Sequence, residues 1–332
     1  MSIPKVLFTR LTALAQREDD VEPYFQYELA VFPPSLFKDG LMRKPDKPSL
    51  RKALLPNTDL IEKDNLSPQI WYTIDGGALL HRVRWMKGWT FQKVAEHYVA
   101  YVKRHYGKEA YIVFDGYDKP STKSNEHTRR AALNRCPNIN IVEANTVQCT
   151  QDQFLSNEKN KVQLIQLISR FLLNDNHTVT QCDADADTKI VSTALELAIL
   201  DETHDVVVVA DDTDIAVMLL YHWKEELGEI IFYQERQQKG WSIKQAAERL
   251  GDLREHVLFV HAWSGCDTVS APYGKGKLSF LNQVTKNELL KDVSVTTMND
   301  AWAVQEDVGK ASQTIFNIMY SGKERDTLIK LR

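Results

Sequence analysis

Two short stretches of the sequence gather aspartates beside hydrophobic segments. In "CDADADTKI" three aspartates occupy alternate positions before an apolar helical pattern, and "VVVVADDTDIAVML" places three more directly after an apolar run. Carboxylates repel one another, so such groups need either full solvation or a positive charge between them. The six residues are Asp183, Asp185, Asp187, Asp211, Asp212 and Asp214.

Simpler interpretations account for these aspartates less well. One aspartate is enough to cap a helix N-terminus or to populate a turn. A calcium-binding EF-hand does not fit, because Thr188 and Ala194 stand where its loop requires glycine and glutamate. A haloacid-dehalogenase-type phosphatase fits weakly, because Asp212 and Asp214 are in place but Ala216 occupies the final position of that motif.

Grouped carboxylates are the ligands that hard divalent cations such as Mg²⁺ and Mn²⁺ prefer. Two such ions about 3.5–4 Å apart hold both oxygens in the displacement at a phosphodiester. In the absence of metal, we expect some of these acids to have raised pKa values. The aspartates therefore predict a site for two divalent cations.

The elements that would position these acids alternate between apolar strands and amphipathic helices. Continuous apolar runs between helices are typical of a parallel α/β sheet covered on both faces. We expect strands over 69–74, 110–114, 139–142, 205–210 and 229–233, and helices over 90–107, 160–173 and 187–200.

The acids follow the predicted strands. Asp75, Asp115 and the Asp211–Asp212 pair each come directly after the carboxyl end of a strand. In open α/β sheets, ligands bind outside these ends. Acids that are distant in sequence are therefore expected to meet at one edge of the sheet.

Five segments, taken in order, resemble the flap-endonuclease branch of the PIN-like nuclease superfamily. They are "IDGGALLHR", "VFDGYDKPSTKSNEHTRR", "CDADADTKI", "VVVADDTDIAVML" and "AWSGCDTVSAPYGKGK". The chain is also similar to uncharacterised animal proteins with the pattern "GCDT…GKGK". The resemblance implies that seven acids hold two Mg²⁺ or Mn²⁺ ions, namely Asp75, Asp115, Asp183, Asp185, Asp212, Asp214 and Asp267.

The same resemblance implies basic groups that contact nucleic acid. Lys123 and Arg130, seven residues apart and with Arg129 beside the latter, would hold the phosphate at the base of a helical arch. A solvated helix face is the alternative. The glycine-rich turn would offer backbone groups and charge to a phosphate and a K⁺ ion, unless its glycines simply end a helix. Its residues are Gly274, Lys275, Gly276 and Lys277.

The chain also departs from that family. Aspartate replaces both glutamates of the family's E-x-E pair. Asp187 has no counterpart, so we expect it at the periphery of the site together with Asp211. The arch region, about 116–180, is compact, and some 70 residues precede the first strand. Both features argue against a preference for 5′-flaps.

Three parts of the chain are expected. Residues 1–69 form an irregular N-terminal extension, residues 70–260 the PIN-like core, and residues 261–332 a helical segment that grips nucleic acid. The aromatic residues of the extension predict that it packs over the α/β core, with "MRKPDKPSLRK" exposed. A linker from an upstream domain is the alternative.

Composition limits the remaining classes. The net charge of −4 predicts that any nucleic-acid surface is a local patch, such as the basic window 101–135. The four cysteines form no C-x-x-C, so we expect no disulfide framework, no disulfide-linked partner and no zinc. Without a signal peptide or an apolar run that could span a membrane, the expected location is intracellular, nuclear or cytoplasmic.

These observations together predict a metal-dependent, structure-selective nuclease. Its expected partner is DNA or RNA with junctions between single strand and duplex. The competing hypothesis is a nuclease-like scaffold that binds nucleic acid or protein without cleaving it. Clustered carboxylates favour the enzyme, because negative charge beside a phosphate gains nothing for a module that only binds.

Overall fold

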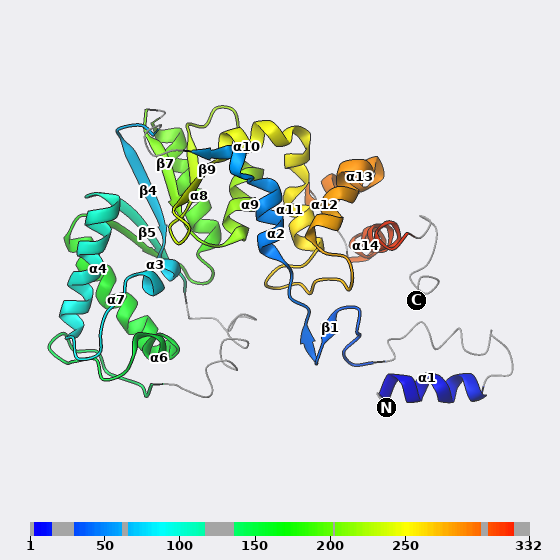
Figure 1. Ribbon diagram of the computed structural model, residues 1–332, viewed down its shortest axis with the longest axis horizontal. Coiled ribbons are helices and arrows are strands. Elements are labelled where there is room, and N and C mark those ends of the chain that lie inside the picture. Colours follow the sequence, from blue (N-terminus) through cyan, green and yellow to red (C-terminus); the bar gives the residue numbers. More distant parts are fainter. Residues whose placement is uncertain are drawn as a thin grey trace. The chain divides into compact units, whose positions relative to one another are not determined.

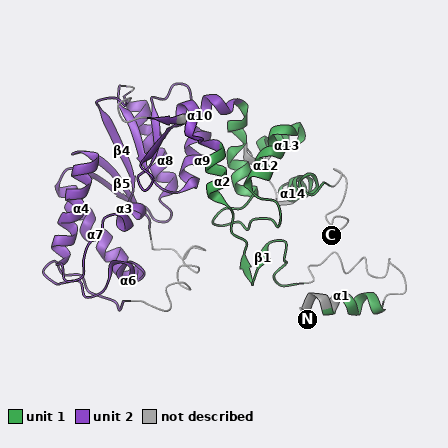
Figure 2. Ribbon diagram, viewed as in Figure 1, with its two compact units in different colours: residues 1–53, 252–332 green, residues 54–251 purple. Residues whose placement is uncertain are grey.

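The computed structural model describes residues 3–14, 30–61, 66–116, 136–201, 203–299 and 305–321 (Figure 1). The chain divides into two compact units (Figure 2), one formed by residues 54–251 and the other by residues 1–53 and 252–332. The sequence pattern predicts divisions at 69/70 and 260/261 instead. The observed boundary at 53/54 lies earlier than 69/70 because β3 (Leu60–Ile61) pairs with β9 (Lys239–Ser242) and so joins the sheet.

Within the described residues of the α/β unit, seven strands form one sheet in the order β3-β9-β8-β7-β4-β5-β6. The five strands from β8 to β6 are parallel, whereas β9 and β3 extend the sheet as antiparallel strands at one edge. The predicted α/β class with a mainly parallel sheet is thus confirmed. The parallel strands are β4 (Ile70–Asp75), β5 (Ala110–Phe114), β6 (Thr178–Gln181), β7 (Asp205–Val209) and β8 (Ile230–Gln234).

Apolar residues on both faces of the strands explain the layers. In β7, Val207 and Val209 belong to the core shared with α4 and α7, whereas Val206 and Val208 are buried outside that cluster. Alternate residues of a strand point to opposite faces, so a strand without polar positions needs helices on both sides. The helices of this unit are α3 (Gly76–Arg82), α4 (Phe91–Tyr106), α6 (Gln151–Leu155), α7 (Glu158–Asn174), α8 (Asp187–Leu200), α9 (Thr213–His222) and α10 (Ile243–Leu250).

The strand order reverses at β4. The chain passes from β4 to β5 and β6 on one side, then crosses to β7 on the other side of β4 and continues to β8. Ligands in open α/β sheets bind outside the carboxyl ends of strands at such a switch point. In register, Asp75 of β4 lies opposite Val113 of β5, and Ile74 lies opposite Val209 of β7. The residues that follow these strands therefore share one edge.

One predicted strand is wrong, and one observed strand was missed. Residues 139–142 form no strand, because the N–H groups of Ile139 and Ile141 donate to the side chains of Asn160 and Gln163 on α7. The neighbour of β5 is instead β6, whose sequence "TVTQ" is short and polar. Its position at the sheet edge, where it is half-buried or exposed, explains why no apolar run marks it.

The second unit is helical and includes the N-terminal extension. The backbone N–H groups of Ala271 and Tyr273 donate to the carbonyls of Arg43 and Ser35, and the N–H of Arg43 donates to Oγ of Ser270. The extension thus packs against the C-terminal helical segment within this unit. Its elements are α1 (Ile3–Leu14), β1 (Phe37–Lys38), β2 (Leu41–Met42), α2 (Lys47–Leu54, whose last residue falls in the α/β unit), α11 (Val257–Trp263), α12 (Lys277–Lys286), α13 (Glu288–Asn299) and α14 (Gln305–Met319).

The prediction that "MRKPDKPSLRK" is exposed is only partly right. Leu50 and Arg51 are buried, since α2 is amphipathic and turns one face inward. The remaining short helices are η3 (Asn57–Asp59) and η5 (Gly251–His256). No helix in the described part of the chain combines the length and apolar character needed to cross a bilayer.

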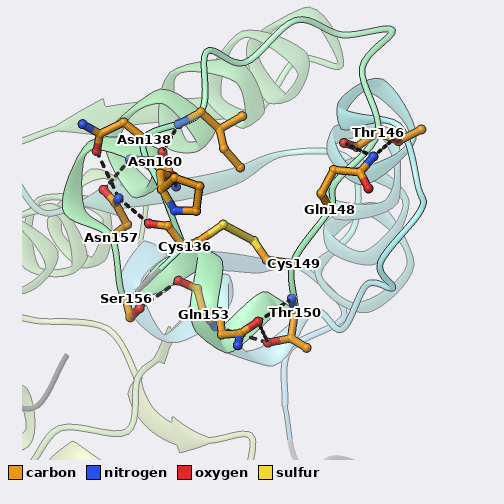
Figure 3. The surroundings of a disulfide bond; sticks show 12 residues. Cys136, Asn138, Thr146, Gln148, Cys149, Thr150, Gln153, Ser156, Asn157 and Asn160 are labelled. Carbon is orange, nitrogen blue, oxygen red and sulfur yellow. Dashed lines mark hydrogen bonds between the residues drawn. A yellow bond between two sulfur atoms is a disulfide. The ribbon is translucent and has the colours of Figure 1, made fainter. Parts of the chain in front are cut away.

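A single disulfide bond among the described residues joins Cys136 and Cys149, a pairing that the expectation of no disulfide framework did not include (Figure 3). The bond closes the loop before α6, and Nδ2 of Asn157 donates to the Cys136 carbonyl at 2.8 Å. Thr150, the next residue after Cys149, caps α6. The cysteines are 13 residues apart without a recognisable spacing motif, so only the folded loop brings them together.

Breaking this disulfide should destabilise the α/β unit. Closure of a loop of this length removes conformational freedom from the unfolded chain, which corresponds to about 2–3 kcal/mol. The double variant Cys136→Ser/Cys149→Ser should lose that amount in urea unfolding, and dithiothreitol should have the same effect on the wild type. The double variant is its own control, since reductant should not change it further. Equal stability with and without reductant in the wild type would contradict the assignment.

Candidate metal centre

Asp75 ends β4 and begins α3. Its Oδ1 accepts hydrogen bonds from the N–H groups of Gly77 at 2.8 Å and Ala78 at 3.2 Å, so the carboxylate caps the helix. A Cβ atom at Gly76 would overlap the ring of Phe114, the last residue of β5. The glycine after Asp75 therefore allows α3 to pack directly on β5, which fixes where the carboxylate lies.

Asp115 lies on the other side of Gly77. A side-chain carbon at Gly77 would be 3.1 Å from Oδ1 of Asp75 and 3.6 Å from Oδ2 of Asp115, so the two carboxylates approach each other across this glycine. Oδ1 of Asp115 accepts the N–H of Ala186 at 3.0 Å. The loop before α8 thereby orients the carboxylate that follows β5.

Gly116 explains how that loop comes so close. A Cβ atom there would overlap the backbone of Cys182 and Asp183, and its N–H donates to the Ala184 carbonyl at 2.6 Å. Any other residue would push the two chain segments apart. The glycine of the "FDG" segment is thus required by a close approach of two backbones.

Three carboxylates form the tightest acidic cluster among the described residues. One oxygen each of Asp187, Asp212 and Asp214 lies within 4.8 Å of the other two, and all three side chains are half-buried. Asp212 caps α9 by accepting the N–H of Asp214 at 3.1 Å, and Asp187 is the first residue of α8. The N-termini of two neighbouring helices thus bring these acids together.

The position of Asp187 corrects the sequence analysis, which placed it at the periphery. Asp183 and Asp185, predicted as metal ligands, are both exposed. Oδ1 of Asp185 accepts the N–H of Asp187 at 3.0 Å, which is a local turn contact. The structure therefore favours Asp187 over Asp183 as the partner of the Asp212–Asp214 pair. The helical pattern contained a signal for this, since Asp187 lies one turn before the buried Ile190.

The charges at this edge act on one another. The pKa of Asp75 is raised to about 6, mainly by burial and also by the negative charges of Asp115 and Asp212, while the hydrogen bonds from Ala78 and Gly77 lower it. Asp212 therefore acts both on Asp75 and within the cluster of Asp187 and Asp214. The acids thus form one electrostatically coupled group. Asp75 and Asp115 make up one side and Asp187 and Asp214 the other, and Asp212 interacts with both.

Lys161, which sequence reasoning missed, faces the same group. It is half-buried in the first turn of α7, and burial lowers its pKa while the charges of Asp115 and Asp75 raise it. No motif marks this residue, because its helix is read from the sequence as an ordinary amphipathic helix. Only the packing of α7 brings its ammonium within electrostatic range of the two carboxylates.

Asp211 forms an ion pair with Arg82. Its Oδ2 lies 3.1 Å from Arg82 of α3, and Arg82 also lies 3.2 Å from Glu235, the residue after β8. The hydroxyl of Tyr101 donates to the same glutamate. Arg82 thus links the ends of β7 and β8 beside the cluster, and neither it nor Glu235 was singled out from the sequence.

Four more predicted site residues lie either outside the described residues or in the other unit. Lys123, Arg129 and Arg130 lie outside the described residues. Asp267 belongs to the other unit, where its carboxylate lies 2.7 Å from Nζ of Lys47. Their part in a common site remains a prediction.

The glycine-rich turn is confirmed as a turn, but one of its lysines is misassigned. Gly274 has φ +68°, and Lys275 lies with Nζ 5.3 Å from the centre of the Tyr320 ring. Lys277 is only 1% exposed. A side chain so deeply buried cannot contact a phosphate in this conformation, so its predicted role in nucleic-acid binding is wrong for the structure described.

The donor atoms fit Mg²⁺ or Mn²⁺. The ligands on offer are carboxylate oxygens from Asp187, Asp212 and Asp214 on one side and from Asp75 and Asp115 on the other. Hard divalent cations favour such oxygen donors, whereas zinc sites are mostly built from cysteine and histidine. The pKa of Asp75 is raised mainly by burial and further by the charges of Asp115 and Asp212, and a bound cation would favour its ionised form.

No protein-family model and no curated protein matches the chain. Among solved structures, it is similar to the catalytic core of Rad2 in complex with DNA substrate (complex II), with a TM-score of 0.43 and 12% identity over 82% of each chain. It is also similar to T5 D15 protein co-crystallised with metal ions, with a TM-score of 0.44 and 13% identity over 79% of this chain and 90% of that one. These likenesses are distant, so the chemistry of the chain has to be inferred from its own residues.

The raised pKa of Asp75 predicts that this carboxylate destabilises the metal-free protein above pH 6. The folded state binds the proton more tightly than the unfolded chain, so stability from this group is present below the unfolded value of 3.8 and falls as pH rises to about 6. Asp75→Asn keeps an oxygen to cap α3. In EDTA it should raise the free energy of unfolding by about 2–3 kcal/mol at pH 7.5 and by little at pH 4. Urea unfolding at both pH values measures this, and an equal gain at both would exclude titration as the cause.

The acidic cluster predicts which aspartates bind a divalent cation. Asp187→Asn and Asp212→Asn should each weaken Mn²⁺ binding by roughly tenfold or more in calorimetric titration, by loss of a charged ligand. The matched control is Asp183→Asn, in the same loop but exposed, which should change the affinity by less than about twofold. Equal losses at positions 183 and 187 would restore the assignment made from the sequence.

Proposed function

We propose that this protein is a metal-dependent nuclease that hydrolyses phosphodiester bonds. The observation that supports this most is the coupled group of carboxylates at the switch point of the parallel sheet. Asp75, Asp115 and Asp212 follow three adjacent strands, and Asp187 and Asp214 complete one side of the group. Such a group is costly to fold without cations, and its two sides match the demand of a two-cation hydrolysis.

The carboxylates of the chain would hold two cations. Asp187, Asp212 and Asp214 would hold one Mg²⁺ or Mn²⁺, and Asp75 and Asp115, with Asp212 between the two sides, would hold a second. Bound divalent cations supply charge neutralisation at phosphate oxygens and make water more acidic. The backbone N–H groups of Gly77, Ala78 and Ala186 hold the carboxylates in place throughout, so no reorganisation is needed when substrate arrives.

A positive side chain is also required, because the phosphate gains negative charge during displacement. Lys161 interacts electrostatically with Asp75 and Asp115 and is partly withdrawn from water, where its charge acts more strongly. We assign it to a phosphate oxygen on the Asp75–Asp115 side. Lys123 and Arg130 remain proposed for the same phosphate from the arch, with Arg129 as a further contact to nucleic acid.

The proposed substrate is DNA or RNA with a junction between single strand and duplex. The support is the carboxylate site together with the basic window 101–135 and, in the helical unit, the turn with Gly274, Lys275 and Gly276. Asp267 remains proposed as the last acid of the site. The proposed location is intracellular, nuclear or cytoplasmic.

Cleavage of labelled oligonucleotides tests this function. A flap, a splayed duplex, a single strand and the RNA equivalents should be compared with Mn²⁺ and with EDTA. We expect cleavage only with metal, and a loss in kcat/KM of roughly 100-fold or more in Asp212→Asn and Asp187→Asn. Lys161→Met should lower kcat more than it raises KM.

Asp183→Asn is the matched control and should stay within about threefold of the wild type. Cleavage that survives in Asp212→Asn would indicate a contaminating nuclease. If the wild type binds these substrates without cutting them at high protein concentration, the protein is a nuclease-like scaffold and the proposed activity is wrong.

A further inference from the structure

The helical unit contains a buried ammonium group held mainly by oxygen atoms. Lys277, the first residue of α12, is 1% exposed. Its Nζ donates to the carbonyls of Gly265 at 2.6 Å and His261 at 3.1 Å, and to Oγ of Ser264 at 3.3 Å. Nδ1 of His261 lies 3.2 Å from the same nitrogen. Because an ammonium only donates, that ring nitrogen acts as an acceptor and its proton lies on Nε2.

Four acceptor atoms contact an ammonium that has only three N–H bonds, so the bonds and the acceptors cannot pair one to one. In this respect the arrangement is like the coordination of an ion. Taking an ammonium out of water is costly unless polar groups replace its hydration shell. The contacts described here include two carbonyl oxygens, a hydroxyl and an imidazole nitrogen. Such neutral, mostly oxygen donors suit a monovalent cation, whereas the carboxylates of the other unit suit divalent ones.

The acceptors come from the end of α11 and the residues after it. The last carbonyls of a helix lack partners within the helix, and positive charge is favourable there. The Val260 carbonyl is used by Ser264 and the Ala262 carbonyl by Gly265, while that of His261 is taken by Lys277. The ammonium therefore completes the end of α11 from a position on α12.

The segment between α11 and α12 is held by the same buried ammonium. Gly265 has φ +102°, and a Cβ there would lie 2.7 Å from Cα of Ala271, so the chain folds back closely on itself. The N–H of Cys266 donates to the Val269 carbonyl at 2.9 Å. The segment 264–277 is thus closed at its base by the ammonium, and it carries Asp267 and Lys275 on the way.

We propose that Lys277 serves as a tethered monovalent cation, whose ammonium fills a site that K⁺ or NH₄⁺ would otherwise occupy and so fixes the segment 264–277. The protein then needs no K⁺ ion at this turn, in contrast to the expectation from the sequence. Lys277 is a positioning residue, because it acts through the segment and contacts no substrate.

Cation rescue of a truncated lysine tests the proposal. Lys277→Ala leaves room for an ion among the three oxygen donors, so its Tm should fall by roughly 5 °C or more. At fixed ionic strength, K⁺, NH₄⁺ or methylammonium should recover at least half of that loss. Li⁺ is strongly hydrated and tetramethylammonium lacks N–H donors and is too large, so neither should recover it. The wild type should melt at the same temperature in all five salts.

Two further variants distinguish binding of a cation by the oxygen atoms around Lys277 from simple filling of space. Lys277→Met fills the space with an apolar chain, so it should be destabilised without any recovery by cations. Lys286→Ala removes an exposed lysine from the same helix and should show neither the loss nor the salt effect. If no cation restores Lys277→Ala, or if K⁺ stabilises the wild type relative to Li⁺, the proposal is wrong.

A measurement on the wild type keeps the test independent of how the variants fold. In protein with ¹⁵N-labelled lysine, Nζ of Lys277 should give a slowly exchanging NH₃⁺ signal, because its protons are buried and bonded. The same signal should be absent from Lys277→Arg, which serves for assignment. A fast-exchanging or neutral amine at this position would overturn the proposal.

The tethered cation should also affect how nucleic-acid binding depends on the salt, an expectation that rests on the proposed function. If the segment 264–277 contacts DNA, the wild type should bind a duplex junction equally well in K⁺ and Na⁺, whereas Lys277→Ala should bind more tightly in K⁺ than in Li⁺. Fluorescence anisotropy measures both. If Tm rescue occurs without any DNA binding, the tethered cation stands and the proposed contact of the segment with DNA is wrong. If DNA binds without rescue, the tethered cation is wrong and the proposed contact with DNA stands, while cleavage still decides the nuclease activity.

Discussion

The carboxylates at the switch point repel one another, and backbone N–H groups hold them together despite that repulsion. Asp75 accepts the N–H groups of two residues of α3, Asp115 accepts that of Ala186, and Asp212 accepts that of Asp214. Each of these donors lies at a helix N-terminus or in the loop before a helix, where backbone N–H groups lack partners and the dipole favours negative charge. The helices that cover the sheet thus offset part of the cost of the charges that the strands bring together.

Glycine makes this arrangement possible in two places. At Gly76 the helix α3 packs on the Phe114 ring, and at Gly116 the end of β5 touches the backbone of the loop before α8. Neither contact has space for a Cβ atom. The two glycines therefore set the separation of Asp75 and Asp115 from their surroundings, and they stand directly after these aspartates in the sequence. The geometry of the carboxylates and the packing around them are constrained by the same short segments.

The two units handle charge in opposite ways. In the α/β unit several carboxylates gather at one edge, Arg82 forms ion pairs with Asp211 and Glu235, and burial raises the pKa of Asp75. A cation from solution is therefore expected there. In the helical unit the neutral oxygens around Lys277 already hold a positive charge that is covalently part of the chain. A charge built into the chain is present whenever the unit is folded, whereas a bound ion depends on its concentration.

The sequence by itself determined the class of fold, the strands β4, β5, β7 and β8, and the edge at which the acids gather. Continuous apolar runs and the acids that follow them are local features, and the geometry of parallel strands converts them into one site. The tertiary structure decided what depends on contacts between distant segments. It brought Asp187 rather than Asp183 to Asp212, placed Lys161 within electrostatic range of Asp75 and Asp115, and buried Lys277. It also paired Cys136 with Cys149 and added the polar edge strand β6. Alternate aspartates look equivalent in a sequence, and only the point at which α8 begins, fixed by packing of its apolar face, determines which of them turns inward.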